Sequence, residues 1–471
     1  MKYNQIATLM NSIFGELIGE DGLFAEDLSN VADVGRVIIS TTQWDENFEN
    51  YVRKIVDKVG RVILWDRTYS GDDLGLLREA WEYGSILEKI RVEVGDFVEN
   101  KVWQLPDTPS PDFSGLFDFD SPAEVDAKYF NSKTTFAVKI CIMREQANSA
   151  FKSAEDLARF IGSIENRIRT KMEMSKEALA YRCEANLIIE KVKANNGVYN
   201  VLLQYIMASG DSTIDAENYL QNIEFLRFAY QHQRIDMGLM RKANRLFNVD
   251  GYTTFTPGDR LNVYALSDFA AAMESVLRSQ TYHDEFVTLP GYREVPFWQA
   301  IGTGDYATRS TITAIPASES GALSPTTYTQ PGIIFVMQDK DAAMICCEAQ
   351  PVDSLYNPEG RFYKYFYRHD ASYYNDLAEN CIVYVASPGV LLKVKEASVA
   401  VSGTVDVSTG MVHLPSTGTV SYTSSATGKA TVNSSTGVVT GVAAGETIIT
   451  ASTTVDGITY TDTCKVTVTS T

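Results

Sequence analysis

The chain has 471 residues, of which 45% are hydrophobic and 21% are charged, and its formal net charge at pH 7 is −19. This length predicts about two to four domains. So acidic a surface argues against binding to DNA, RNA or an anionic membrane, because it repels phosphate. The charge is uneven: residues 388–471 hold four Lys and five Asp or Glu, so residues 1–387 carry −18.

The first part of the chain predicts one amphipathic helix and then an extended segment. Residues 1–22 lack the long apolar run and cleavage site of a secretory signal, and no stretch reaches the ~20 apolar residues of a membrane span. Between residues 41 and 60, apolar side chains recur every three or four positions, which predicts a helix closed by Gly60. Residues 105–126 are rich in Pro, Asp and Phe. They predict a long excursion of a kind that is usually functional or bound to a partner.

The clearest predicted element is a helix over 153–197. Ser153 and Asp156 suit its start as a capping box, and residues 195–197, Asn-Asn-Gly, suit its end. Lys191 and Lys193 lie in its last turns, where the helix dipole favours cations. Its apolar residues fall on one stripe: Leu157, Ile161, Ile164, Ile168, Met172, Leu179, Cys183 and Leu187. At 1.5 Å per residue the helix would be about 60 Å long, which predicts a spine for the molecule.

Residues 198–387 predict a mixture of helices and strands. Helices are expected at 225–247 and 266–279, and a hairpin of two buried strands at 332–349. Residues 357–360, Asn-Pro-Glu-Gly, have the chemistry of a turn. In the strand that follows, both faces are aromatic. This predicts a strand with packing on both sides. The alternating residues are Phe362, Lys364, Phe366 and Arg368 on one face and Tyr363, Tyr365, Tyr367 and His369 on the other.

The composition changes at Pro388. Of the last 84 residues, 30 are Ser or Thr, and Tyr422 and Tyr460 are the only aromatic residues. Short runs of Val, Thr and Ile between glycine-containing turns predict a small antiparallel β-sandwich. The rival interpretation is low-complexity disorder, which the alternation of apolar and polar residues at 446–455 and 464–470 disfavours.

No catalytic or cofactor-binding residues are predicted. The histidines are scattered and form no metal-binding motif: His232, His283, His369 and His413. GTGDYA at 302–307 fits a dinucleotide-binding pattern but lacks the strand, helix and acidic residue that give the pattern meaning. The cysteines lack disulfide spacing and predict buried free thiols in a reducing cytoplasm: Cys141, Cys183, Cys346, Cys347, Cys381 and Cys464.

No metal site is predicted either. Asp112, Asp118, Asp120 and Asp126 resemble a calcium loop only loosely, since the required Gly and terminal Glu are missing. Phosphate-binding loops and nucleophile elbows are also absent from the sequence. We therefore expect no enzyme and no cofactor. Arms and excursions that cannot fold back on their own core need other chains to cover them, so the organisation predicts a subunit built for assembly.

Three regions resemble a known family. Residues 31–69 and 356–387 are similar to the matching segments of phi29-like podophage major capsid proteins, which have the Hong Kong 97-like fold of tailed phages. Residues 421–451, with their Ser, Thr, Val and Gly blocks, resemble a bacterial immunoglobulin-like group 2 domain, and Tyr422 stands where that domain usually has Trp.

The resemblance implies an α+β Hong Kong 97-like capsid fold followed by an all-β immunoglobulin-like sandwich. The expected parts are an N-terminal arm with the start of the peripheral domain (1–65), an extended loop (66–140), the peripheral domain with the spine helix (141–220), the axial domain (221–350), a return to the peripheral domain (351–387) and the immunoglobulin-like domain (388–471).

The function that the resemblance implies is structural. The protein would be a major capsid protein that self-assembles, as hexamers and pentamers, into the icosahedral or prolate shell of a tailed phage. Its expected partners are copies of itself, a scaffolding protein and a portal or connector. The shell would form in the host bacterial cytoplasm without a membrane and would enclose dsDNA without specific binding, which suits an acidic wall. The sandwich would be displayed outside, for capsomer stabilisation or for weak adhesion to host or glycans.

Two other functions stay open. An encapsulin-like nanocompartment shell shares the fold class, but it would enclose an enzyme cargo and would not need the C-terminal sandwich. A cell-surface adhesin would explain an immunoglobulin-like tail, although the single repeat and the lack of a secretory signal argue against it.

Overall fold

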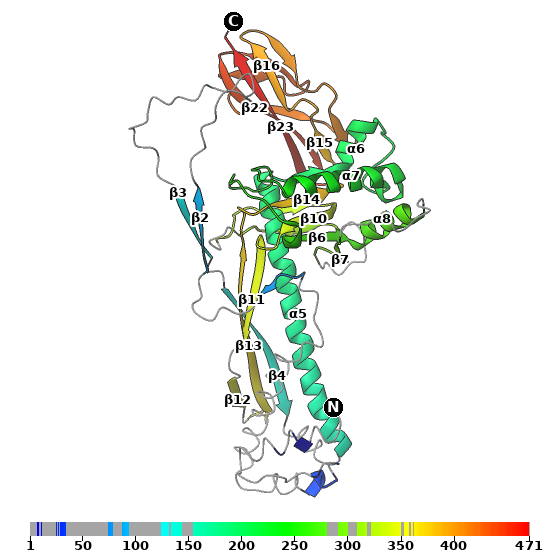
Figure 1. The fold of residues 1–471 in the computed structure, drawn as a ribbon, viewed down its shortest axis with the longest axis vertical. Coiled ribbons are helices and arrows are strands. Elements are labelled where there is room, and N and C mark those ends of the chain that lie inside the picture. Colours follow the sequence, from blue (N-terminus) through cyan, green and yellow to red (C-terminus); the bar gives the residue numbers. More distant parts are fainter. Residues whose placement is uncertain are drawn as a thin grey trace.

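One long helix carries two β-sheets along its length, and a β-sandwich lies at its C-terminal end (Figure 1). The structure is a computed structural model. It describes residues 7–8, 11, 25, 27, 29–33, 74–78, 87–93, 124–130, 133–143, 154–279, 291–299, 309–317, 322–349, 353–357, 359–360 and 362–470. The helix predicted at 41–60 and most of the excursion at 105–126 lie outside the described residues.

Helix α5 (Ala154–Ala194) is the predicted spine. It has 41 residues and is about 60 Å long at 1.5 Å per residue. Its apolar stripe is buried wherever the structure describes the side chains: Ile164, Ile168, Met172, Leu179, Cys183 and Leu187. The helix ends where predicted, because Asn195 and Gly197 have φ of 49° and 66°. Only glycine fits at 197, since a Cβ there would lie 2.6 Å from the Cys381 carbonyl oxygen.

The first sheet lies beside α5 and is built around one central strand. It contains β1 (Leu77–Arg78), β4 (Lys133–Met143), β11 (Ala343–Ala349), β12 (Asp353–Asn357) and β13 (Phe362–Asn375). Strand β13 pairs with β4 along one edge and with β11 and β12 along the other. Its Tyr365 and Tyr367 are buried while Arg368 is exposed. The structure therefore confirms the predicted strand and pairs it along both edges, but the predicted packing on both faces is not observed, because Phe362, Lys364 and Phe366 are only half-buried.

The turn before β13 also forms as predicted. The Asn357 side-chain oxygen Oδ1 accepts hydrogen bonds from the backbone N–H groups of Glu359 at 3.0 Å and Gly360 at 3.1 Å. Such an Asx turn fixes the direction in which the chain reverses, so β12 and β13 meet in antiparallel register.

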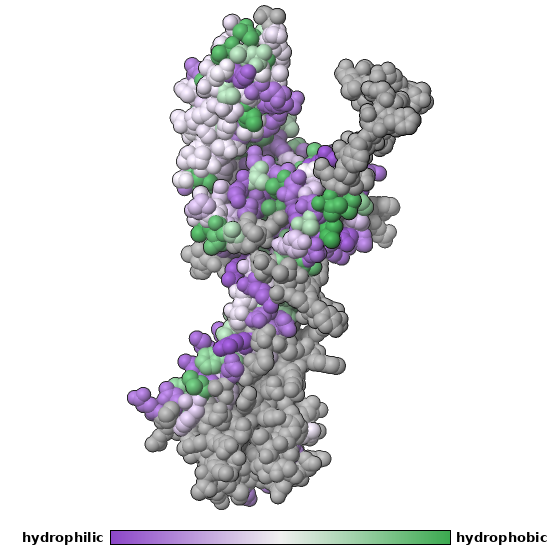
Figure 2. Space-filling view, turned by 90° about the vertical axis from the view of Figure 1, so that its left-hand side faces the viewer, coloured by the Kyte–Doolittle hydropathy of each residue, from purple (hydrophilic) through white to green (hydrophobic). Residues whose placement is uncertain are grey.

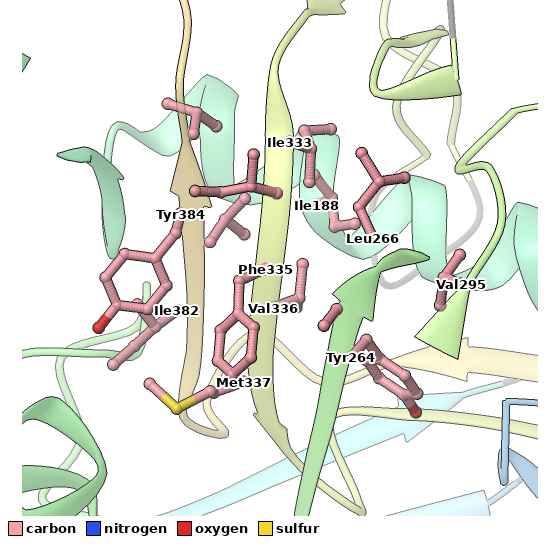
Figure 3. Close-up of a cluster of buried hydrophobic side chains, with 14 of the residues drawn as sticks. Ile188, Tyr264, Leu266, Val295, Ile333, Phe335, Val336, Met337, Ile382 and Tyr384 are labelled. Carbon is pink, nitrogen blue, oxygen red and sulfur yellow. The ribbon is translucent and has the colours of Figure 1, made fainter. Parts of the chain in front are cut away.

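The second sheet holds the main hydrophobic core. Its strand order is β5-β14-β10-β6-β7. The strands are β5 (Val198–Asn200), β6 (Leu261–Leu266), β7 (Arg293–Val295), β10 (Ile333–Asp339) and β14 (Cys381–Val385). Every residue of β10 is buried, so this strand is packed on both faces. In Figure 3, Ile382 and Tyr384 of β14 lie beside β10, and Ile188 of α5 belongs to the same cluster.

Helices and short elements surround this sheet. The helices are α6 (Val201–Ser209), α7 (Ile223–Met240) and α8 (Ser267–Ser279), and the short elements are η2 (Tyr219–Gln221), η3 (Gly258–Arg260), β8 (Ile312–Ala314) and β9 (Tyr328–Gln330). The predicted helix at 266–279 is confirmed. The helix predicted at 225–247 ends earlier, because the Asn244 side chain donates to the carbonyl oxygens of Leu239 and Lys242, at 2.8 and 2.7 Å, and so turns the chain.

The hairpin predicted at 332–349 is wrong. Both strands form, as β10 and β11, but β10 pairs with β6 and β14 whereas β11 pairs with β1 and β13. Residues 340–342 therefore carry the chain from the second sheet to the first. A second crossing, at 376–380, runs beside it: the Asp339 N–H donates to the Asn380 carbonyl oxygen at 2.9 Å, and the Asp376 N–H donates to that of Ala342 at 2.8 Å. Alternation identifies strands but does not identify their partners.

The C-terminal region is an all-β sandwich, and the rival prediction of disorder is wrong. One sheet has the order β16-β23-β22-β19 and the other β17-β21-β20. The strands are β16 (Glu396–Ala400), β17 (Thr404–Asp406), β19 (Ser421–Ser424), β20 (Ala430–Val432), β21 (Val438–Gly441), β22 (Gly445–Val455) and β23 (Ile458–Thr469). Tyr422 and Cys464 are buried in a core of its own. The immunoglobulin-like assignment stays a prediction.

The sandwich is docked on the rest of the chain. Strands β15 (Gly389–Leu391) and β18 (Val412–Leu414) pair with each other, and their Leu391, Val412 and Leu414 pack against the main core. The Asn200 side-chain amide donates to the Ser387 carbonyl oxygen at 2.9 Å. Figure 2 shows the upper, C-terminal part of the molecule mostly pale, as expected for a surface rich in Ser and Thr.

A carboxyl group lies inside the core, where α5 passes the second sheet. Glu184 is buried, and its Oε2 accepts a hydrogen bond from the Gln338 side-chain amide at 2.9 Å. Its Oε1 has no hydrogen-bond partner among the described residues. Burial raises the pKa of Glu184 to about 7, from an ordinary value of 4.5. Between pH 4.5 and about 7, Glu184 therefore keeps its proton in the folded chain but has lost it in the unfolded chain.

Replacing Glu184 with Gln is expected to remove a loss of stability at neutral pH. In the wild-type chain, the free energy of unfolding should fall as pH rises from 4.5 to about 7 and then level off. The neutral variant should lack this fall and be more stable at pH 8 by roughly 3 kcal/mol. Thermal unfolding midpoints measured from pH 5 to 8 will check this, with the exposed Glu224→Gln as control. Parallel curves for wild type and Glu184→Gln would contradict it.

Candidate assembly surface

A two-stranded hairpin stands apart from both sheets and presents two chemically different faces. Strand β2 (Leu87–Glu93) pairs antiparallel with β3 (Glu124–Phe130), with Ile90 opposite Ala127 and Val92 opposite Val125. Successive side chains of a strand point to opposite faces. Along β2, half-buried Leu87, Lys89 and Arg91 alternate with exposed residues, and β3 alternates in the same way. We call these the inner face and the outer face.

The inner face of the hairpin is charged and binds to the subunit's own core. Lys89 pairs with Asp376 and with Glu379, the latter at 2.5 Å, and Arg91 pairs with Glu379 at 2.7 Å. Lys128 pairs with Asp250 and lies 3.4 Å from Asp376. Three cationic side chains of the hairpin thus form ion pairs with three carboxylates from the rest of the chain.

Asp376 is the centre of this charged cluster. Its side chain is fully buried, and its Oδ1 also accepts a hydrogen bond from the Ala378 backbone N–H at 3.0 Å. Burial by itself would raise the pKa of Asp376, but the ammonium groups of Lys89 and Lys128 outweigh it, and the pKa lies below the ordinary 3.8. The carboxylate therefore stays charged at neutral pH. Removing one partner of such a buried pair typically costs ~3–5 kcal/mol.

Tyr252, which lies outside the hairpin, also contacts the inner face. The Tyr252 hydroxyl donates to the Asp126 carboxylate on β3, and this bond raises the pKa of Tyr252. The Arg91 guanidinium lies over the Tyr252 ring, 5.4 Å from its centroid, which is within the range of a cation–π interaction. The inner face is thus held by ion pairs, a hydrogen bond and a ring contact.

The outer face of the hairpin is largely apolar and uncovered in the described structure; its charged residue, Glu88, accepts a hydrogen bond from the Tyr129 hydroxyl at 2.9 Å. Ile90, Val92, Val125 and Tyr129 are 59%, 60%, 66% and 58% exposed. Figure 2 views the side of the molecule on which the hairpin lies in Figure 1, and hydrophobic residues gather there in a patch. A row of large apolar side chains on one face of a hairpin is typical of an interaction surface. The arrangement suits protein–protein contact rather than chemistry.

The family resemblance implied an extended loop at 66–140, but the two faces of the hairpin within it were not predicted. Of the excursion predicted at 105–126, the structure describes only 124–126, inside β3. The signal was present in LEKIRVE at 87–93, where charged and apolar residues alternate with period two. The acidic partners could not be foreseen, because the contact between Lys89 and Asp376 spans 287 positions.

The residues considered for chemistry are dispersed. His232 lies on α7, where its Nδ1 is 3.2 Å from the Phe228 carbonyl oxygen, and His413 lies on β18. The Asp126 carboxylate accepts a hydrogen bond from the Tyr252 hydroxyl. The other positions lie outside the described residues: Asp112, Asp118, Asp120, His283, residues 302–307 and the side chain of His369. Within the described ranges no group of three His, Cys, Asp or Glu residues could hold a metal ion.

The cysteines form no disulfide bonds. All six cysteines are free thiols; Cys183, Cys346, Cys381 and Cys464 are buried and Cys347 is half-buried. Cys141 is exposed, which corrects the prediction that all would be buried, because its side chain lies on the exposed face of β4.

Among the described residues, no helix combines the length and apolar character that crossing a membrane requires.

Comparison with known proteins gives one family match and several remote structural likenesses. A family model described as "Phi29-like phage major capsid protein" matches residues 10–385. No curated protein matches the chain. The capsid structure of Staphylococcus phage Andhra is 9% identical, with 69% of this chain and 86% of that chain covered and a TM-score of 0.44.

Two other solved structures are similarly distant. A chain from "head fiber and inner core protein gp22 of native bacteriophage P68" is 10% identical, with 68% of this chain and 86% of that chain covered and a TM-score of 0.41. A chain from the capsid of cyanophage P-SCSP1u is 11% identical, with 69% and 93% covered and a TM-score of 0.33.

Proposed function

The chain belongs to the family of Phi29-like phage major capsid proteins, so its role is that of a structural subunit of a phage capsid shell, and from this premise we propose how it assembles. Copies of the chain associate as hexamers and pentamers into a closed icosahedral or prolate shell, and the subunit performs no catalysis. The observation that carries the proposal is the β2–β3 hairpin, whose inner face is satisfied by its own subunit and whose outer face is apolar and exposed.

The occupant of the outer face is a second copy of the chain. Ile90, Val92 and Val125 cannot be covered by the inner-face contacts, because they point the opposite way along the strands. In a shell, every subunit offers the same hairpin to a neighbour, so one contact repeats around each capsomer. The part of the chain at 66–140 then acts as the extended loop of a capsid subunit.

The remaining parts take matching roles. The first sheet and α5 are assigned to the peripheral domain (141–220 and 351–387), and the second sheet with α7 and α8 is assigned to the axial domain (221–350). Residues 1–65 are assigned to the arm and the start of the peripheral domain. The sheets of the structure cross these bounds. The second sheet also includes β5 and β14, from outside 221–350, and the first sheet includes β11, from inside 221–350, together with β1 and most of β4, from inside 66–140.

The partners follow from the charge and from the family. Residues 1–387 carry −18, and such a wall holds dsDNA without adhering to it. We propose that a separate scaffolding protein guides assembly and that a portal or connector occupies one vertex for DNA entry. Assembly takes place in the cytoplasm of the host bacterium.

The sandwich at 388–471 is proposed to be an immunoglobulin-like group 2 domain on the outer surface of the shell. Its parallel β16–β23 pairing and its own core support an independent β module appended after the last strand of the second sheet. Its role is either to stabilise contacts between capsomers or to adhere weakly to host or glycans.

Expression of the chain with and without a candidate scaffolding protein tests the assembly proposal. We expect closed or tubular particles by negative-stain electron microscopy and a fast-sedimenting species in the ultracentrifuge. Protease should reach the sandwich on intact particles before it reaches the spine. A chain that stays monomeric with every scaffold and at every concentration would refute the proposal.

A further inference from the structure

The charged cluster joins the hairpin to a part of the subunit that cannot move by itself. Asp376 and Glu379 lie in the 376–380 crossing between the two sheets. Besides the bonds to the 339–342 crossing, this segment accepts from the Val249 N–H at the Leu377 carbonyl oxygen, at 2.9 Å. Asp376 and Asn380 are fully buried. The hairpin is therefore fixed at the junction of both sheets and α5 rather than at a loose surface loop.

Assembly could use the hairpin in two ways. If the hairpin had to leave its own subunit, the buried Asp376 carboxylate would lose the Lys89 and Lys128 ammonium groups, and no other cation of the described residues pairs with it except Arg91 of the same hairpin. An uncompensated buried charge is strongly unfavourable. If the hairpin stays bound to its own subunit, its outer face is already exposed and can contact a neighbouring subunit. The geometry favours the second way.

We propose that Lys89, Arg91 and Lys128 with Asp250, Asp376 and Glu379 form a latch that stays closed during shell assembly and presents the outer face at a fixed angle. The inference rests on the proposed role of the hairpin as the intersubunit loop. Its physical basis is preorganisation: a loop that is already ordered loses less conformational entropy when a neighbour binds. The latch would thus lower the concentration at which subunits polymerise.

Opening the latch should loosen the hairpin and weaken assembly. In Asp376→Asn with Glu379→Gln, which keep the side-chain shapes, we expect backbone amides of 87–93 and 124–130 in the unassembled subunit to exchange hydrogen at least about tenfold faster. The concentration needed for half-maximal assembly should rise by about tenfold or more. The matched control is Glu446→Gln with Lys465→Met, an exposed pair on the sandwich, which should change neither quantity. Unchanged exchange in the hairpin of the latch variant would overturn the proposal.

Closing the latch covalently distinguishes a latch that stays shut from one that must open. In a Cys141→Ser, Cys347→Ala background, Lys128→Cys and Asp250→Cys can be joined by a short bismaleimide. Linked subunits should form shells at the concentration of the background chain. Failure of linked subunits to assemble, while unlinked ones succeed, would show that release is required and would overturn the proposal.

These measurements separate the latch from the assembly proposal. Hydrogen exchange is read on free subunits and reports the latch whether or not shells form. Absence of particles from the wild-type chain under all conditions would refute the assembly role, whereas wild-type particles together with normal assembly of Asp376→Asn, Glu379→Gln would refute the latch alone.

Discussion

Replacing Ile90 and Val125 with Asp is expected to give a folded subunit that forms no shells. Both side chains lie on the outer face and are mostly exposed, so their replacement removes little packing within the subunit. In a shell the two carboxylates would be buried against an apolar neighbour without partners, which is unfavourable by at least ~1–3 kcal/mol for each group. The concentration needed for assembly should therefore rise by about 100-fold or more.

Sedimentation velocity and negative-stain microscopy across a concentration series will check this result. The matched control is Ile90→Leu with Val125→Ile, which keeps the outer face apolar and should assemble like the wild type. Thermal unfolding of the free subunit should shift by no more than a few degrees in either variant. Shells of normal yield from the Asp variant would show that the outer face is not an assembly contact.

Replacing Ala180 with Pro is expected to destabilise both sheets together. Ala180 is fully buried, one turn before the point at which α5 contacts both sheets. There the Cys183 thiol donates to the Asn375 side-chain oxygen of β13 at 2.9 Å, and Glu184 accepts from Gln338 of β10. Proline within a helix removes a backbone hydrogen bond and clashes with the preceding turn, which costs ~3 kcal/mol or more.

The proper comparison is Ala180→Gly, which lowers helix propensity without breaking the helix and should cost only about 1 kcal/mol. Calorimetry or circular dichroism should show one transition at a much lower temperature for the Pro variant, or no soluble folded protein. Near-equal midpoints for the Pro and Gly variants would mean that the spine does not hold the two sheets together.

Elements with a strong local period could be predicted from the sequence. The helix predicted at 153–197 agrees with α5 to within a few residues, because a 3.6-residue stripe persists for some forty positions and ends in Asn-Asn-Gly. The sandwich and the Asn357 turn were likewise local signals. Lys191 shows the limit of such reasoning: its position suits the helix dipole, yet it is fully buried, and its Nζ donates to the Phe247 carbonyl oxygen at 2.7 Å.

Pairings between distant segments could not be predicted. Strands β10 and β11 are consecutive and both apolar, and only the crossing at 340–342 separates them into different sheets. The charged cluster could not be predicted for a similar reason, since nothing in the sequence around Lys89, Lys128 and Asp376 distinguishes them from exposed charged residues, and only the fold brings them together. Long-range contacts of this kind depend on three-dimensional packing that local patterns do not encode.

The order of the latch residues along the chain has a consequence for synthesis on the ribosome. The hairpin strands are complete by residue 130, but the carboxylates that hold them at 376 and 379 are translated about 250 residues later. Strand β4 likewise cannot pair with β13 until β13 has been translated. A truncated chain released before this point would lack an ordered hairpin, and so prematurely terminated products would be poor competitors for places in a growing shell.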